Sequence, residues 1–305
     1  MSGANVAVAA TPRAAATYRR RRIRPRRVAL YGFLTFMAAV WLFPIVWVLY
    51  TALRPYAETQ RDGYLSIATS LGFGNFVDAF NQGEFPKFYL NSLIVTVPAV
   101  IVTLLVASLV AFSVSRFSWR FNLIVLMIFT AGNLLPQQVI IVPLYRLYLA
   151  LPLPQPISDS GSLYDQYIGI ILIHIVFQVG FCAFVLSNYM KTLSQELTEA
   201  ALVDGASVLR IWGAIVMPLC RPALAALAVL EFTFIYNDFF WALLLMKTGD
   251  RRPITSALNN LQGQFFTDFN LLAAGALLAA IPTIIVFMVL QRHFVAGLSL
   301  GSSKG

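Results

Sequence analysis

Long stretches without a charged side chain constrain this 305-residue chain more than any other feature. Four of these stretches contain no Asp, Glu, Lys or Arg: residues 28–53, 88–115, 121–145 and 269–291. Two more are nearly uncharged, because residues 166–190 hold only His174 and residues 222–246 hold only Glu231 and Asp238. A helix needs about 20 apolar residues to cross a bilayer. The pattern therefore predicts an all-α, polytopic membrane protein with six transmembrane helices.

Composition supports the same class. Charged residues make up 11% of the chain and hydrophobic residues 59%, whereas soluble domains carry about 25% charged residues. So few charges exclude an ordinary soluble enzyme, a disordered chain and a coiled coil. The two cysteines, Cys182 and Cys220, lie in unrelated segments and predict neither a disulfide framework nor a metal site.

The basic residues are distributed unevenly. With the N-terminus placed in the cytoplasm, the inner segments hold 15 of the 22 lysines and arginines. The positive-inside rule therefore favours cytoplasmic placement of both termini. The run at residues 19–27 could bind nucleic acid or anionic lipid, but directly before an apolar span it is better interpreted as a cytoplasmic anchor.

These patterns divide the chain into five consecutive regions. They are a basic tail (1–27), a first transmembrane helix (28–53), an extracytoplasmic loop (54–87), a transmembrane domain (88–291) and a cytoplasmic tail (292–305). The glycines of the last region suit either a flexible approach to a partner or a frayed terminus.

One long inner loop, residues 191–221, has a helical pattern. Thr192 and Gln195 fit a capping box, with Ser194 as an alternative cap. Gly205 can end a first helix in the left-handed conformation, and Ser207 can cap a second one. We expect two short helices over about residues 194–217, joined by a sharp bend on the cytoplasmic face.

Two surfaces could receive this helix pair. The alanines leave a shallow face for another protein, and the carboxylates could meet basic residues there. The alternative is an amphipathic helix lying on lipid. The acids weaken that alternative, because a lipid-bound helix normally carries Lys and Arg on its polar face.

The loop also resembles a known signature. Glu199-Ala200-Ala201, Asp204-Gly205-Ala206 and Ile215-Val216-Met217-Pro218 resemble the EAA motif of type I ABC importer permeases, here at residues 199–218. Asn91-Ser92-Leu93, Pro136-Gln137, the stretch at 236–241 and the end at 291–298 are similar to the shorter, six-span permease of maltose-type carbohydrate importers. Ser194-Gln195 departs from the family, where many members have a proline.

The resemblance implies a type I importer fold and a transport role in the cytoplasmic membrane, without catalysis by this chain. It implies that a separate ATPase dimer docks on the coupling residues: Glu199, Ala200, Ala201, Asp204, Gly205 and Trp212. A second permease subunit and an extracytoplasmic solute-binding protein would complete the complex. ATP and Mg²⁺ would bind the ATPase, since this chain lacks the phosphate-binding motif G-x-x-x-x-G-K-[ST], and we expect no cofactor or nucleic acid on it.

The fifth apolar stretch contains the first candidates for a translocation path. Glu231 and Asp238 are seven residues apart, so a continuous helix would place them on nearly one face with Trp241 and Asn237. Carboxylates and amides bond sugar hydroxyls, and aromatic rings cover the apolar faces of sugars. The two acids could instead pair with polar groups of a second permease or stabilise a contact within the bundle.

The third stretch contains the second set. Pro136 beside Gln137 and Gln138 predicts a kink that lines a cavity or gate, or else an interhelical hydrogen-bond network. His174 lacks a second ligand nearby, so we expect it to form a hydrogen bond between helices.

A rival function is an ion-coupled secondary carrier that uses Glu231 and Asp238.

Overall fold

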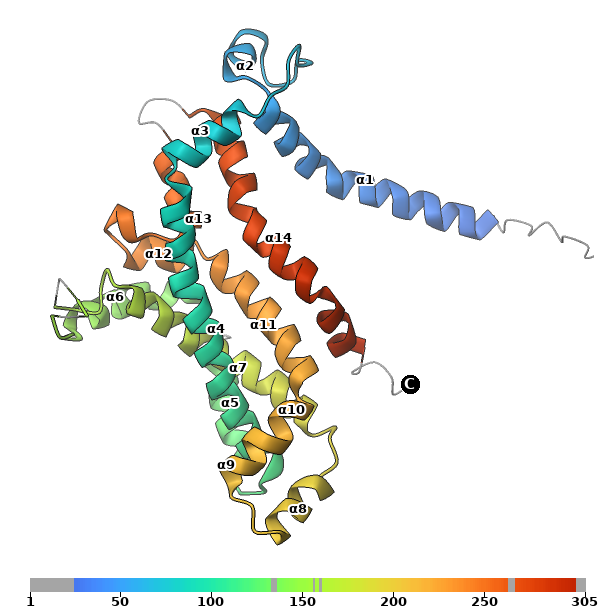
Figure 1. Ribbon diagram of the computed structural model, residues 1–305, viewed down its shortest axis with the longest axis vertical. Coiled ribbons are helices and arrows are strands. Elements are labelled where there is room, and N and C mark those ends of the chain that lie inside the picture. The colour runs from blue at the N-terminus through green and yellow to red at the C-terminus, as the bar shows by residue number, and fades with distance from the viewer. Residues whose placement is uncertain (1–24, 133–135, 156, 159–160, 263–266, 300–305) are drawn as a thin grey trace, which may run out of the picture. The chain divides into compact units, whose positions relative to one another are not determined.

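The computed structural model describes residues 25–132, 136–155, 157–158, 161–262 and 267–299 (Figure 1). Residues 1–24 of the predicted basic tail and residues 300–305 of the predicted C-terminal tail lie outside this part. The chain divides into two units, Met1–Trp47 and Val48–Gly305. Within the described residues the secondary structure is helical, apart from an isolated β-bridge between Pro152 and Ser162. The all-α prediction is confirmed.

Four described helices are long and apolar enough to cross a membrane. They are α1 (Pro25–Leu53), α4 (Phe85–Arg116), α7 (Tyr167–Met190) and α14 (Phe269–Ser299). Each coincides with a stretch predicted as a span, and helix α14 continues eight residues beyond the predicted end at Gln291. Most of α1 belongs to the first unit.

The two remaining predicted spans are interrupted. The stretch at 121–145 contains α5 (Asn122–Ala131), and then η2 (Gln137–Ile140) leads into α6 (Ile141–Ala150). Pro136 has extended backbone angles and precedes η2 directly. The interruption lies next to Pro136, where a kink is predicted, because a proline lacks the N–H that helix continuation requires.

The fifth predicted span is broken as well. Helix α11 (Arg221–Tyr236) ends inside the apolar stretch, and α12 (Phe240–Leu245) follows after residues 237–239. The chain then passes through η4 (Gly249–Arg251), α13 (Ile254–Ala257) and η5 (Leu258–Leu261) before α14 begins.

The second unit is organised around α4. Helix α7 packs along α4, while α11 packs against both α4 and α14. Figure 1 shows α8, α9 and α10 gathered at one end of this unit, with α3 (Gly74–Gln82) at the opposite end beside the start of α14. We call the first end inner and the second end outer, following the predicted orientation.

Apolar side chains form an inner cluster beneath the end that holds α8–α10. Its buried members from α4 and α7 include Ala107, Phe112, Leu186 and Met190. Ala201, Ile211, Val216 and Cys220 join them from the segment between α7 and α11. The inner cluster therefore connects the long helices with the short helical segments at this end.

The loop after α1 folds around a buried arginine. The guanidinium of Arg54 is 1% exposed, and its Nη1 donates to the carbonyl oxygens of Gly63 at 2.8 Å and Ser66 at 3.2 Å. Its Nη2 lies 3.8 Å from Oε1 of Glu58 in α2 (Tyr56–Asp62). The backbone N–H of Thr69 donates to the same carboxylate and holds the pKa of Glu58 below its usual value of 4.5.

Candidate coupling helices and membrane break

The inner loop forms two consecutive helical segments, as its sequence predicts. Helix α8 (Glu196–Val203) comes first. After a bend, α9 (Val208–Arg210), a π-helical segment η3 (Ile211–Val216) and α10 (Met217–Leu219) follow without a gap. These segments project from the inner end of the unit in Figure 1.

The bend has a defined hydrogen-bond pattern. Gly205 has φ +76°, its N–H donates to the carbonyl of Leu202 at 3.0 Å, and the N–H of Ala206 donates to that of Ala201 at 3.0 Å. These two bonds form a Schellman motif, which satisfies carbonyls at the end of a helix. The predicted left-handed glycine is confirmed, and the sequence Asp204-Gly205-Ala206 thus has a physical explanation.

Of the helix caps predicted from the sequence for these two segments, the structure contains only one. Ser207 caps α9, since its hydroxyl accepts a hydrogen bond from the N–H of Arg210 at 3.4 Å. The capping box predicted for α8 is wrong. The Thr192 hydroxyl donates back to the Tyr189 carbonyl at 2.7 Å, and the Gln195 amide donates to the Glu199 side chain at 3.0 Å.

Some of the predicted coupling residues are exposed, and others pack against the inner cluster. Glu199, Ala200, Asp204 and Gly205 are exposed. Ala201 is 8% exposed and belongs to the inner cluster, and the half-buried Trp212 packs against that cluster. One of the two alanines therefore faces outward, while the other anchors α8.

Two apolar side chains accompany the exposed carboxylates. Val203, at the end of α8, is 88% exposed and Leu209 in α9 is 70% exposed. They flank the bend at Gly205 in sequence. Two strongly exposed apolar side chains beside carboxylates are compatible with a surface that another protein covers.

A buried arginine supports the loop from behind. Arg116, the last residue of α4, is 8% exposed, and its Nη1 donates to the carbonyls of Leu193 at 3.2 Å and Ser194 at 3.4 Å. In the sequence Arg116 is only one of the 15 basic residues of the inner segments. Its partners are backbone oxygens, which leave no signal in the side-chain pattern.

The π-helical segment precedes a proline. Pro218 has no N–H to donate, and its ring would clash with the carbonyl four residues earlier in a regular α-helix. The wider turn of η3 directly before α10 provides space at that point. The chain then bends by 78° between Val208–Leu219 and Arg221–Tyr236, with Pro222 in the first turn of α11 as predicted.

The first acid of the fifth stretch is fully buried. Glu231 in α11 has no exposed surface, and its Oε1 accepts a hydrogen bond from the Cys182 thiol of α7 at 3.1 Å. Its Oε2 has no hydrogen-bond partner among the described residues. A carboxyl group in such a position joins α7 to α11.

The second acid stands at the break after α11. Asp238 accepts hydrogen bonds from the N–H groups of Trp241 at 3.3 Å and Ala242 at 3.1 Å, so it caps α12. Its Oδ2 also lies 3.6 Å from Nε2 of His174 in α7. Because α11 ends at Tyr236, the prediction that Glu231 and Asp238 share one face of a continuous helix is wrong.

The other path candidates differ in exposure. Asn237 is exposed, and its amide donates to the carbonyl of Thr233 at 2.8 Å. Trp241 is 2% exposed and packs against Phe177, with ring centroids 5.4 Å apart. Pro136 is exposed and Gln137 half-buried, at the separate break before η2.

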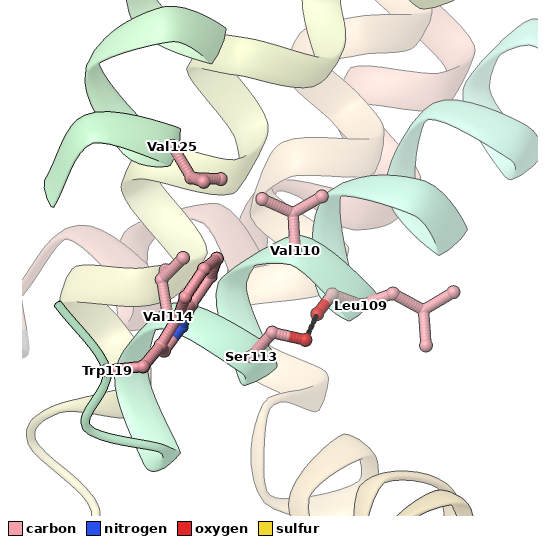
Figure 2. A pocket seen from close by; sticks show the side chains of 6 residues that line it. All are labelled: Leu109, Val110, Ser113, Val114, Trp119 and Val125. Carbon is pink, nitrogen blue, oxygen red and sulfur yellow. Dashed lines mark hydrogen bonds between the residues drawn. The ribbon is translucent and has the colours of Figure 1, made fainter. Parts of the chain in front are cut away.

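A shallow pocket lies between α4 and α5 near their inner ends, and Figure 2 shows its side chains. Its volume is about 230 Å³, and its lining is Leu109, Val110, Ser113, Val114, Trp119 and Val125. The Ser113 hydroxyl donates within its own helix, to the Leu109 carbonyl at 2.9 Å. Such an apolar lining does not suit a sugar, which needs several polar partners.

Comparison with known proteins assigns the chain to a family. Residues 90–300 match the family model described as the inner membrane component of binding-protein-dependent transport systems. The chain belongs to this family. The matched region includes the α8–α10 segment and the break after α11, so the features described above lie within the family's own domain.

Curated relatives of this permease family match nearly full length. A probable ABC transporter permease of Pyrococcus horikoshii is 30% identical, covering 85% of this chain and 91% of its own. A permease for uptake of osmoprotective compounds from Synechocystis is 30% identical, covering 88% and 89%. An arabinooligosaccharide transport permease of Bacillus subtilis is 28% identical, covering 92% and 96%. The predicted resemblance to carbohydrate-type ABC importer permeases is confirmed.

A solved structure shares the fold. It is the crystal structure of a bacterial ABC transporter that imports the acidic polysaccharide alginate. The TM-score is 0.73 at 22% identity, over 90% of this chain and 98% of the matched chain. The importer fold implied by the EAA motif is therefore confirmed. As the family match states, the chain is an inner membrane component, and in ABC importers ATP hydrolysis belongs to separate subunits.

Proposed function

We propose that this chain is the permease subunit of an ATP-driven importer that moves a carbohydrate, or a small polyol conjugate, across the cytoplasmic membrane. An ATPase dimer with bound ATP and Mg²⁺ drives it from the cytoplasmic side, where both termini lie. A second permease and an extracytoplasmic solute-binding protein complete the complex.

The α8–α10 segment carries this proposal. It presents Glu199, Val203 and Leu209 to water on a bend fixed by the Schellman motif at Gly205. Exposed apolar side chains on either side of the bend, together with exposed carboxylates, suit a groove with an apolar floor and basic walls. Docking there lets closure of the ATPase pull directly on the inner cluster, which is the kind of differential contact that two-state gating requires.

The names of the relatives support a carbohydrate cargo. Besides the arabinooligosaccharide permease, a Bacillus subtilis permease for melibiose, raffinose and stachyose is 27% identical over 93% of this chain and all of its own. The relative for osmoprotective compounds motivates the polyol conjugate as an alternative cargo.

The break after α11 is the proposed place where cargo meets this subunit. Asn237 is exposed there beside Phe234, which is 58% exposed, and Phe239, which is 41% exposed. An exposed amide that lies in sequence between two exposed aromatic residues offers both the polar and the apolar surface that a sugar requires. Glu231 and Trp241, which are buried, and the half-buried Asp238 would hold this segment from behind. Pro136 with Gln137 would border the path at the second break.

The test of function uses the complex co-expressed with its ATPase and reconstituted in liposomes. We expect ATP-dependent uptake of radiolabelled arabinooligosaccharide or raffinose when the binding protein is present. Glu199→Lys and Gly205→Asp should release the ATPase in pull-down or abolish stimulated hydrolysis. Asp78→Lys makes the same change of charge as Glu199→Lys, but on the exposed face of outer helix α3. It serves as the control for ATPase retention.

Two results would refute the proposal. ATPase retention and stimulated hydrolysis that survive both coupling variants would remove the α8–α10 segment from energy coupling. Uptake that continues without ATP and collapses with an ionophore would instead select an ion-coupled carrier. Both acids that such a carrier would use already have partners within the chain, Cys182 for Glu231 and the start of α12 for Asp238.

A further inference from the structure

Helix α4 is fastened by buried polar side chains at both ends. At the inner end, Arg116 donates to the carbonyls of Leu193 and Ser194, which lie in the loop that enters α8. We call this contact the inner clamp. Because its acceptors are backbone atoms, it fixes the position of the loop itself rather than of one side chain.

The outer clamp is centred on Asn91, which is 5% exposed. Its amide nitrogen donates to the carbonyls of Asp250 at 2.8 Å and Arg252 at 3.0 Å. Its amide oxygen accepts from the Tyr167 hydroxyl at 2.7 Å, which ties α7 to the same point. The outer loop at residues 246–253 is therefore fixed to α4.

Two neighbours of Asn91 strengthen the outer clamp. The Ser92 hydroxyl oxygen accepts the N–H of Ile254 at 2.8 Å, just after the same loop. The ammonium of Lys87 lies 2.7 Å from Oδ1 of Asp250. Lys87, Asn91 and Ser92, on two consecutive turns of α4, thus hold one outer segment.

Between the clamps, small side chains let α4 lie close to α7. Ala99, Thr103, Ala107 and Ala111 recur every four residues and have no exposed surface. Such a stripe allows two helices to approach closely within a membrane. From Asn91 to Arg116 the helix spans roughly 37 Å at 1.5 Å per residue.

We infer that α4 is a strut that transmits position between the outer loop 246–253 and the loop entering α8, with Arg116 and Asn91 as its positioning residues. This inference rests on the proposed function. It assigns to the outer loop the role of transmitting the docking of the binding protein to the coupling helices. The connection runs through α4, which remains one helix across Pro98, and through two sets of side-chain-to-backbone hydrogen bonds.

The first experiment measures rigidity in the assembled complex. Spin labels at Lys191→Cys and Lys247→Cys, both exposed positions, report the distance between inner and outer loops. The native cysteines are buried, so labelling is directed to the introduced ones. We expect one narrow distance distribution that MgATP does not change, and a distribution at least twice as broad in Arg116→Met or Asn91→Leu.

The second experiment measures coupling as stimulated over basal ATP hydrolysis, with the binding protein and raffinose or arabinooligosaccharide as probes. Arg116→Met and Asn91→Leu should each lower this ratio at least fivefold. Arg116→Lys should recover part of it, because an ammonium reaches one carbonyl. Ser113→Ala is the matched control on α4, since that hydroxyl bonds within its own helix.

The double variant separates transmission from mere destabilisation. Distant, independent sites have additive effects, so two unrelated defects would multiply in the double variant. If both clamps serve one strut, Arg116→Met with Asn91→Leu lowers the ratio no further than the stronger single change. Multiplicative losses, or a distribution in the unmodified chain that is already broad, would overturn the inference. Failure of the unmodified complex to retain its ATPase would instead count against the proposed function.

Discussion

Replacing Gly205 with alanine tests the coupling bend through backbone conformation alone. At φ +76° an added Cβ meets no atom within 4 Å, so the substitution introduces no clash with neighbours. What remains is the intrinsic cost of the left-handed conformation, about 1–2 kcal/mol for a residue with a Cβ. That cost lowers the population of the correctly bent loop roughly 5- to 30-fold.

The assay is the affinity of the purified ATPase for the permease complex in nanodiscs. We expect Gly205→Ala to raise Kd by the same factor, roughly 5- to 30-fold. The Kd of Gly205→Asn should lie between those of the unmodified chain and Gly205→Ala, because asparagine tolerates the left-handed conformation better than other side chains. Gly213→Ala is the control, since Gly213 lies within helical η3 with open space around it. Equal affinity of the Gly205 and Gly213 variants would refute the role assigned to the bend.

Three further changes test the supporting structure. Glu58→Gln should remove a pH-dependent part of the stability. Because the pKa of Glu58 is lowered in the folded chain, its ionised carboxylate stabilises the fold at pH values above the ordinary pKa of 4.5. This contribution is lost as the pH falls through the lower pKa of the folded state. Thermal unfolding at pH 3–7 should therefore vary less in the variant, and an unchanged pH profile would contradict this. Asp238→Ala should lower unfolding free energy by about 1 kcal/mol through loss of the α12 cap, while Asp238→Asn retains most of it; equal losses in denaturant titration would argue against capping. Gly169→Ala should lower the unfolding free energy by about 1–3 kcal/mol, because the added Cβ would lie 2.6 Å from the carbonyl oxygen of Leu163. An unchanged melting temperature would show that the backbone shifts to relieve this contact.

The sequence predicts the parts of the site that depend on local backbone chemistry. Gly205 and Ser207 occupy their expected positions because a left-handed glycine and a hydroxyl cap have few substitutes. The start of α8 escapes prediction, since Thr192 has a competing acceptor in the Tyr189 carbonyl.

Breaks inside apolar stretches are harder to predict. Hydropathy averages over a window, so residues 121–145 and 222–246 each appear as one span although the helix is interrupted within each. Only the first interruption has a signal in the sequence, at Pro136. Asp238 illustrates the reason: its carboxylate caps α12 instead of extending the face of α11. The clamps of Arg116 and Asn91 join residues far apart in sequence through backbone carbonyls, and periodicity contains no information about such pairs.

The exposed apolar side chains of Val203 and Leu209 also have a consequence for the amount of protein in the cell. In the proposed orientation, a permease synthesised without its ATPase would display these side chains to the cytoplasm, where chaperones and proteases recognise exposed apolar residues. We expect the orphan subunit to turn over faster than the assembled complex, so that the supply of ATPase sets how much permease accumulates.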